Sequence, residues 1–303
     1  MTRQVDVLVI GAGPAGLTAA ARLAAAGVGR VEVLDREQRA GGVPRHCAHG
    51  GFGTWHHPLT GPAYARRLLA AALDAGAVVR TGVTALDWAG PLELNTVGPG
   101  GPEAIAARAI VLATGARERP RTARLVPGTR PAGVYTTGEL QQAVHLFGQR
   151  IGTRAVIVGA EPVSYRAADT VRVAGAEVVA MVTERERAQA HPVRAQDARL
   201  RRRIPLLTGT VVAELLGHGR LSGVRVRRQD GRTAELACDT VVFTGDFVPE
   251  QELVRRGGLT LGTGTPRTSR PGVFAVGGLA RPGQSAAEAA HAGARVAAVV
   301  MRL

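Results

Sequence analysis

Short apolar runs alternate with helix-like segments along the whole chain. The first run, Val5–Ile10, stops at a glycine-rich turn, a helical pattern follows, and a second apolar run ends on Asp35. The same order recurs over residues 154–184. Strands that alternate with helices in this way are typical of parallel sheets covered by helices. We therefore expect an α/β fold with an internal repeat.

The same patterning predicts the remaining elements. A helix is expected over 63–75, a strand and turn over 77–88, a hairpin-like loop at 98–102 and a short strand at 109–112. Further along, alternating residues predict a β-hairpin over 221–237 that turns at Asp230-Gly231, then a strand at 239–244. Residues 271–300 read as a strand, a glycine pair, a loop and a helix.

The first turn has the spacing Gly11-x-Gly13-x-x-Gly16. In a dinucleotide-binding unit the three glycines allow a tight turn, a close approach of backbone to pyrophosphate, and tight packing of helix on strand. Pro14 lies early in the helix, where a missing N–H costs little. Asp35 ends the second strand, where an acid accepts hydrogen bonds from a ribose. The motif predicts a dinucleotide site, and its alternative is an α/β turn that binds nothing.

Composition narrows the class of protein. The chain has 303 residues, enough for two domains, and a net charge of +14 in which all 38 Lys-or-Arg positions are arginine. Without lysine, Schiff-base and P-loop chemistry are excluded. Aromatic residues make up only 3%, and the single dense basic run, 199–203, is typical of a solvated helix face. Nucleic-acid binding is therefore not expected.

The cysteine count, the position of the first strand and the apolar stretches bear on the cellular location of the protein. Cys47 and Cys238 are too few for a disulfide framework. The first strand begins directly after residues 1–4, so we expect no signal peptide. The apolar stretch 292–301 is short and contains Arg295, so no membrane span is expected. These features indicate a cytoplasmic protein.

With the elements in this order, the chain resembles the two-dinucleotide-domain flavoproteins, the superfamily of thioredoxin and glutathione reductases. The strand ends at 113–115 and 244–245 and the returning segment 273–278 match that superfamily's order over nearly the whole chain. The resemblance implies an FAD-binding Rossmann-like domain, residues 1–120 and 246–303. It also implies a connecting segment, 121–153, and an inserted Rossmann-like domain of the NAD(P) type, 154–245.

A narrower resemblance lies in segments 41–53, 59–67, 114–121 and 127–142. They are similar to the FAD-binding subunits of multi-subunit amine and imino-acid dehydrogenases: opine oxidase, hydroxyproline and proline dehydrogenases, sarcosine-oxidase-like enzymes and hydrogen cyanide synthase. This implies an FAD-dependent oxidoreductase that works beside a second flavoprotein and a small iron–sulfur protein. The implied substrate is a small amine or imino acid.

The resemblance also implies which residues bind FAD. They lie in the first glycine turn, at the ends of strands, and at the glycine pair of the returning segment. The residues are Gly11, Gly13, Pro14, Ala15, Gly16, Asp35, Arg36, Gly42, Val43, Val83, Ala113, Thr114, Gly115, Gly277 and Gly278. At Gly278 the superfamily often has an aspartate, so a side-chain contact is lost here. Backbone N–H groups at this turn remain to serve the pyrophosphate.

The second fingerprint departs from the pattern. It reads Gly159-x-Glu161-x-x-Ser164, with a glutamate where backbone should meet pyrophosphate. The substitution adds bulk and a like charge, so NAD(P) binding by this domain is doubtful. Arg185 and Arg187, just past the next strand, have the chemistry to hold a 2′-phosphate, but the altered turn argues against that contact.

Cys47 is a weak catalytic candidate. No Cys-x-x-Cys is present, so dithiol exchange is not expected. A neighbouring His46 or Arg45 would lower its pKa, and the alternative is a small buried residue. Cys47 also lies within a histidine-rich stretch (His46, His49, His56, His57). That stretch lacks a second cysteine pair, so no metal is expected, and the histidines are assigned to a flavin or electron-transfer surface.

Two other functions stay open at this point. One is a stand-alone NAD(P)H-dependent reductase that passes electrons through FAD to a protein acceptor. The other is a non-catalytic module of a complex, a flavin relay or scaffold. The substrate rests on family likeness alone.

Overall fold

The chain forms two units in the computed structural model, which describes residues 2–54 and 56–303. Unit 1 comprises the chain up to Arg117 together with Val248–Leu303, and unit 2 comprises Glu118–Phe247. The chain leaves unit 1 at β9 (Ala116–Glu118) and returns at β18 (Phe247–Pro249), and these two short strands pair with each other.

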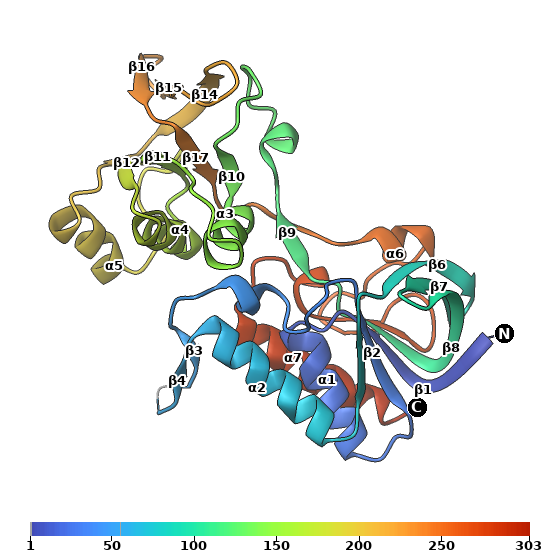
Figure 1. Cartoon of the computed structure of the whole chain (residues 1–303). Coiled ribbons are helices and arrows are strands. Elements are labelled where there is room, and N and C mark those ends of the chain that lie inside the picture. The colour runs from blue at the N-terminus through green and yellow to red at the C-terminus, as the bar shows by residue number, and fades with distance from the viewer. Residues whose placement is uncertain (1, 55) are drawn as a thin grey trace. The chain divides into compact units, whose positions relative to one another are not determined.

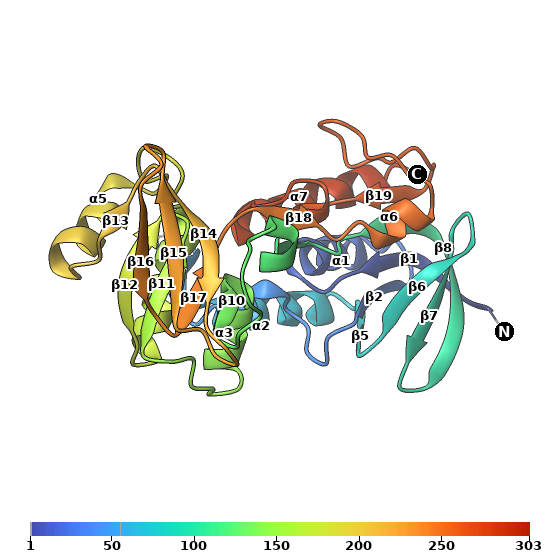
Figure 2. The ribbon, with the colours of Figure 1, turned by 90° about the horizontal axis from the view of Figure 1, so that it is seen from above.

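Unit 1 is built on a sheet in the order β5-β2-β1-β8-β7-β6, with β19 also paired to β8. Its strands are β1 (Thr2–Ile10), β2 (Val31–Asp35), β5 (Val78–Thr81), β6 (Thr84–Gly90), β7 (Glu93–Gly98), β8 (Gly101–Leu112) and β19 (Val273–Ala275). Pairing is parallel except where β7 meets β6 and β8 (Figure 2). The predicted short strand 109–112 is longer than expected, because residues 101–106 pair with β7. A small hairpin, β3 (Phe52–Gly53) with β4 (Pro58–Leu59), lies outside this sheet.

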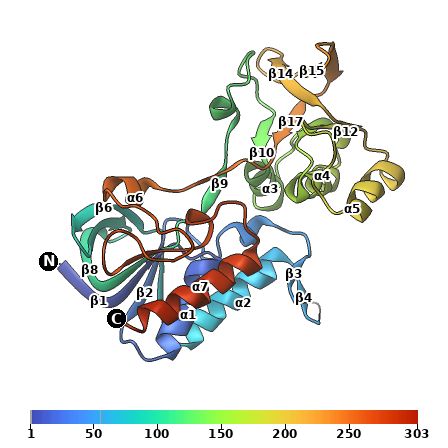
Figure 3. The same ribbon diagram turned by 180° about the vertical axis from the view of Figure 1, so that it is seen from behind.

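Three helices, α1 (Pro14–Ala25), α2 (Gly61–Asp74) and α7 (Ala286–Val300), lie side by side on one face of that sheet (Figures 1 and 3). Alternate β1 residues divide between two cores: Val7 and Val9 pack against these helices, while Leu8 and Ile10 face α6 (Glu252–Arg256) and the β6–β8 strands. This period of two follows from strand geometry. Short helical turns, η1 (Val43–His46) and η4 (Gly277–Leu279), complete unit 1.

Unit 2 repeats the plan with a parallel sheet in the order β10-β17-β11-β12-β13. Its strands are β10 (Val134–Thr136), β11 (Arg154–Val158), β12 (Glu177–Val182), β13 (Leu206–Leu207) and β17 (Thr240–Phe243). Its helices are α3 (Thr137–His145), α4 (Pro162–Val173) and α5 (Pro192–Gln196), with turns η2 (Arg121–Arg124) and η3 (Asp197–Arg201). An antiparallel sheet, β14 (Thr210–Leu216), β15 (Gly223–Arg228) and β16 (Thr233–Ala237), appears at the top of unit 2 in Figure 1 and contains the predicted hairpin.

Two expectations need correction here. Segment 121–153 is not a mere connection: it carries β10, which pairs with β17, and α3, whose start is capped by Thr136 and Glu139, and it lies within unit 2. The arginine run 199–203 is not purely solvated, because Arg202 pairs with Asp169 and Asp197. Both features depend on partners distant in sequence, which periodicity does not reveal.

Among the described residues, no helix is long and apolar enough to cross a membrane.

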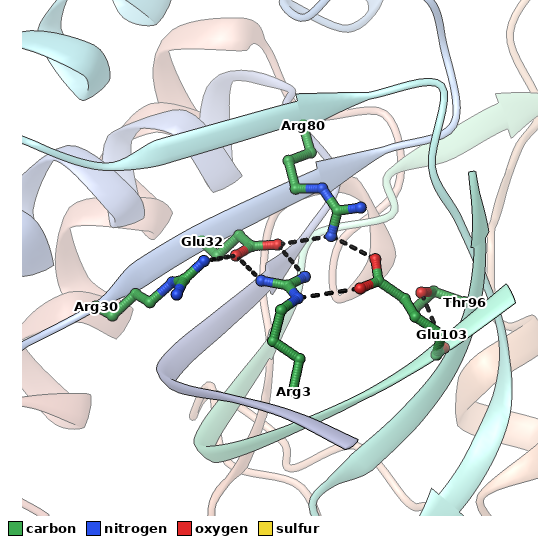
Figure 4. A network of polar contacts seen from close by, with 6 residues as sticks. All are labelled: Arg3, Arg30, Glu32, Arg80, Thr96 and Glu103. Carbon is green, nitrogen blue, oxygen red and sulfur yellow. Dashed lines mark hydrogen bonds and ion pairs between the residues drawn. The ribbon is translucent and has the colours of Figure 1, made fainter. Parts of the chain in front are cut away.

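A network of ion pairs links four strands of unit 1 (Figure 4). Glu32 on β2 is fully buried and accepts hydrogen bonds from Arg3 on β1 (2.6 Å) and Arg80 on β5 (3.2 Å). Glu103 on β8 accepts from Arg3 (3.0 Å) and pairs with Arg80 at 2.5 Å. Burial raises the pKa of Glu32, but the hydrogen bonds from both arginines outweigh it, so the pKa of the carboxyl lies below its usual value.

Removing one member of this network should destabilise unit 1. We expect Glu32→Gln to lower the free energy of unfolding by about 3 kcal/mol, because it sets a fully buried amide NH2 against the partly buried guanidinium groups of Arg3 and Arg80 and removes the charge that pairs with them. Urea unfolding measures the change. Glu93→Gln on β7 is the control, since the hydrogen bond that Glu93 accepts within the described part of the chain comes from the exposed Thr2 hydroxyl. An unfolding midpoint for Glu32→Gln equal to that of the wild type would contradict this role.

A second carboxylate clamps the sheet of unit 2. Asp239 accepts hydrogen bonds from the backbone N–H groups of Thr153 (2.8 Å) and Arg154 (3.0 Å) and from the hydroxyls of Thr153 and Thr240. Burial raises the pKa of Asp239, but these hydrogen bonds outweigh it and hold the pKa at about 2. The charged form is therefore favoured in the folded state.

This clamp predicts an acid dependence of stability. Because the folded-state pKa lies below the usual 3.8, the stabilisation is complete above that value and is lost as the pH falls toward 2. Urea unfolding of the wild type should therefore show a loss of about 1 kcal/mol between pH 7 and pH 3 from this group. Asp239→Asn should remove that part of the pH dependence, whereas Glu177→Gln, an exposed carboxylate of β12, should keep it.

Candidate flavin site

The first glycine turn brings the ends of β1 and β8 into direct backbone contact. Gly11 has φ +107°, and a Cβ there would lie 2.4 Å from the carbonyl oxygen of Ala113. A Cβ at Gly16 would lie 1.9 Å from the oxygen of Gly11. Any side chain at either position would therefore push α1 away from the sheet. These two glycines are required for packing.

Gly13 is different, because it is open. A Cβ at this position would meet nothing within 4 Å. Gly13 is the N-cap of α1, and no side chain caps that helix. The backbone N–H groups at the start of α1 are thus available to an anion, which the positive end of the helix dipole favours. This is the fit that a pyrophosphate requires.

Other predicted residues gather around this helix start. Gly42 is so close that its Cβ would lie 2.9 Å from the Gly13 Cα, and a Cβ at Gly277 would lie 2.8 Å from the Cβ of Ala15. The Thr114 hydroxyl donates to the carbonyl oxygen of Glu250 at 2.8 Å. The structure therefore brings together the first glycine turn, Gly42, the end of β8 and η4, which lie far apart in the sequence.

Gly278 has a packing reason for its small size. A Cβ there would lie 3.1 Å from the backbone nitrogen of Ala116 and 3.2 Å from the carbonyl carbon of Gly115. A larger residue would require β9 to shift by a few tenths of an ångström. The glycine that replaces the superfamily's aspartate therefore has a packing reason, because backbone atoms of Gly115 and Ala116 lie close to it.

Asp35 holds the turn as well as facing the site. Its buried carboxylate accepts hydrogen bonds from the backbone N–H groups of Ala12 (2.7 Å) and Glu37 (2.9 Å). Burial raises its pKa, and the two backbone hydrogen bonds oppose this. Each oxygen keeps a free lone-pair position. The carboxylate thus orders the loop before any ribose hydroxyl reaches it.

Three predicted residues lie at the margin. Arg36 is exposed and pairs with Glu250 at 3.8 Å, and Val43 at the start of η1 is 57% exposed. Val83 is buried, and its N–H already donates to the oxygen of Asp35 at 2.9 Å. The N–H of Val83 is therefore already used within unit 1.

The cysteine and histidines separate into different environments. Cys47 is buried, with its thiol donating to the oxygen of Val43 at 3.4 Å. His46 is buried, whereas His56 and His57 are exposed and His49 stacks on Phe52. Among the described residues, no three His, Cys, Asp or Glu side chains converge in a way that would hold a metal.

Gln284 is a candidate site residue that the sequence did not indicate. Its amide nitrogen is buried and has no hydrogen-bond partner among the described residues, and it would lie 3.6 Å from a Cβ at Gly277. An orphaned buried donor beside the glycine pair fits an acceptor on a bound cofactor. Its position just before the N-cap of α7 carries no sequence signal by itself.

The second turn does not offer the same opening. The carboxylate of Glu161, the N-cap of α4, accepts hydrogen bonds from the N–H of Ala160 (3.1 Å) and the hydroxyl of Ser164 (3.0 Å). A cavity of about 560 Å³ lies farther along unit 2, and its lining includes Arg185, Arg227 and Arg228. Of the two arginines considered for a 2′-phosphate contact, Arg185 lines this cavity, while Arg187 is not among the lining residues.

Comparison with known proteins identifies the family to which the chain is similar. A model of the pyridine nucleotide-disulphide oxidoreductase family matches residues 5–294. The alpha subunit of sarcosine oxidase from Corynebacterium sp. (strain U-96) is 30% identical over 269 residues, which cover 80% of this chain and 26% of that protein. The chain thus spans about a quarter of the length of that relative.

Two further relatives and one structure complete the comparison. The A subunit of opine oxidase from Rhizobium meliloti is 29% identical, covering 97% of this chain and 62% of that protein. Thioredoxin reductase from Mycolicibacterium smegmatis is 29% identical, covering 90% and 88%. The structure of thioredoxin reductase from T. acidophilum superposes with a TM-score of 0.83 at 22% identity, covering 99% of this chain and 98% of that one, a likeness that shows the fold.

The chain therefore belongs to the pyridine nucleotide-disulphide oxidoreductase family. The expected α/β architecture, with an FAD-type Rossmann-like domain and an inserted NAD(P)-type domain, is confirmed. The family is one of flavin-dependent oxidoreductases, and membership in it implies FAD, the cofactor that was expected.

The contrast between Gly13 and Gly16 gives a direct test of the site. We expect Gly13→Ala to fold like the wild type, because its Cβ meets open space, but to bind FAD about tenfold more weakly or worse, equivalent to about 1.4 kcal/mol. Gly16→Ala should instead lower the unfolding midpoint. Flavin absorbance after dialysis and urea unfolding measure the two effects.

Gly100→Ala is the matched control, since that glycine also has open space but lies in the β7–β8 turn. Equal FAD retention by the Gly13→Ala variant and this control would exclude Gly13 from the cofactor contact.

Proposed function

We propose that this chain is the FAD-binding subunit of a heteromeric amine or imino-acid dehydrogenase. One observation carries the proposal. The sequence has two cysteines, and Cys47 lies in unit 1 while Cys238 lies in unit 2, both buried. Burial, with the charge of Asp239, raises the pKa of Cys238 to about 11. A dithiol beside the flavin, which disulfide exchange requires, is therefore not available to this chain.

The relatives supply the direction of the proposal. The sarcosine oxidase and opine oxidase relatives are, by name, subunits of oxidases. We assign to this chain a small amine or imino acid as the source of electrons. A second flavoprotein and a small iron–sulfur protein are its proposed partners, and transfer between subunits replaces transfer through a dithiol.

The residues of unit 1 have distinct tasks in this proposal. The FAD supplies the electron chemistry, as cofactors do. Gly13 and the start of α1 bind the pyrophosphate, and Asp35 keeps the turn in place through Ala12. Gln284 donates its unpaired amide hydrogen to the cofactor. Gly11 and Gly16 serve packing, and the remaining predicted residues, Pro14, Ala15, Arg36, Gly42, Val43, Val83, Ala113, Thr114, Gly115, Gly277 and Gly278, line or support the same cradle.

Reconstitution with partners tests this function. We expect the FAD-loaded chain alone to leave sarcosine and opines unoxidised. The chain co-expressed with the proteins encoded beside it should co-purify with a second flavoprotein and a small iron–sulfur protein and reduce a dye acceptor when the amine is added. Cys47→Ser should keep this activity. Absence of any co-purifying flavoprotein, or loss of activity in Cys47→Ser with FAD retained, would refute the proposal.

A second candidate is a stand-alone NAD(P)H-dependent reductase of a protein acceptor. It is favoured by the thioredoxin reductase from Mycolicibacterium smegmatis, of which this chain covers 88%. Anaerobic mixing of the FAD-loaded chain with NADPH or NADH separates the two functions. Rapid bleaching of the flavin supports the reductase, and an unchanged flavin spectrum supports the role within a heteromeric dehydrogenase.

A further inference from the structure

The two glycine turns of this chain both lead into a helix, but the two helices have different N-cap residues. α1 and α4 both begin with a proline in the first turn, after an N-cap residue in extended backbone conformation. In unit 1 the N-cap is Gly13, which has no side chain and no neighbour within 4 Å of a Cβ. In unit 2 the N-cap is Glu161, which brings a carboxylate of its own.

That carboxylate folds back over the turn instead of pointing away from it. One oxygen of Glu161 accepts hydrogen bonds from the Ala160 N–H and the Ser164 hydroxyl. The same oxygen would lie 2.7 Å from a Cβ at Gly159, and its carboxyl carbon 3.4 Å from a Cβ at Gly245. The charge therefore lies over the two glycines that end β11 and β17, where parallel strands of such folds present a phosphate site.

Neighbouring groups hold this arrangement in place. The Ser164 hydroxyl accepts from the N–H of Glu161 (3.1 Å) and lies 2.6 Å from the hydroxyl of Thr244, which in turn donates to the oxygen of Val158 (2.9 Å). Ser164 and Thr244 are buried. The carboxylate thus belongs to a network whose members all have partners, and it is not a flexible surface group.

A cation from unit 2 supports the same end of the sheet. The half-buried Arg124 donates to the carbonyl oxygens of Thr244 (3.1 Å) and Gly245 (2.9 Å). The N–H of Gly245 donates to the buried carboxylate of Glu118 at 3.0 Å. The backbone groups that border the turn are therefore already paired within unit 2.

We propose that Glu161 is an internal substitute for the pyrophosphate, which closes the second dinucleotide site of this chain. The residues present do not fit NAD(P), because the dinucleotide would have to displace a hydrogen-bonded carboxylate and bring its own negative charge beside it. Like charges placed together cost several kcal/mol at an interface. Unit 2 keeps the fold of a nucleotide domain while its phosphate position is filled by the chain itself. This inference goes beyond the proposed function, which concerns the flavin of unit 1.

Binding to the FAD-loaded protein tests the proposal. Equilibrium dialysis with NADH and with NADPH should show weak binding or none for the wild type. Glu161→Gly, which restores the glycine of the fingerprint, should bind about 10- to 100-fold more tightly. Glu161→Gln, which keeps the size but removes the charge, should fall between the two. Glu177→Gln is the control, because it removes an exposed carboxylate from the opposite end of the β11–β12 pair and should bind like the wild type.

Two results would overturn the proposal. One is a wild type that binds either nucleotide as tightly as Glu161→Gly does. The other is a Glu161→Gly protein that retains FAD and its wild-type circular dichroism spectrum but gains no affinity. Should Glu161→Gly unfold, Glu161→Gln decides in its place, since it preserves the shape of the cap: a gain of affinity supports the proposal, and no gain refutes it. Neither result depends on amine oxidation, so this proposal and the proposed dehydrogenase function fail separately.

Discussion

Unit 1 depends on backbone touching backbone at one turn. The gaps that a Cβ would fill at Gly11 and Gly16 are already occupied by the carbonyl oxygens of Ala113 and Gly11. α7 approaches α1 in the same manner, since a Cβ at Gly293 would lie 2.2 Å from the oxygen of Ala15. This close approach sets α1 against β1 and β8. It also fixes the position of the start of α1, where no side chain caps the backbone N–H groups that would favour an anion.

The two halves of the repeat show how one fold supports different chemistry. The structural glycines, Gly11 in unit 1 and Gly159 in unit 2, both have positive φ angles and both end a parallel strand. The two turns differ at the N-cap position, because Gly13 has no side chain, whereas the Glu161 carboxylate folds back over its own turn and accepts from the N–H of Ala160. A fold can therefore persist after its ligand position has been occupied by a side chain, since packing and binding rest on different residues of the same motif.

Charge in this chain is organised mostly by arginine. The buried carboxylate of Glu32 is surrounded by guanidinium groups from neighbouring strands. The carboxylates of Asp35, Glu118 and Asp239 are held by backbone N–H groups instead. Arginine suits the first arrangement because its planar group offers several donors in fixed directions. The large positive charge is thus partly a structural feature of the sheets, and its presence alone indicates no nucleic-acid partner.

The sequence by itself determined the α/β class, the repeated dinucleotide units and the residues of the first turn. Those signals are local, since strand alternation and glycine spacing are set by backbone geometry over a few residues. It did not determine that 121–153 builds part of unit 2, that Arg202 is ion-paired, or that the Gln284 amide nitrogen is buried beside Gly277 without a partner among the described residues. The fold of the Glu161 carboxylate onto its own turn was equally hidden. These features arise from contacts between residues far apart in the chain, and only tertiary structure brings such residues together.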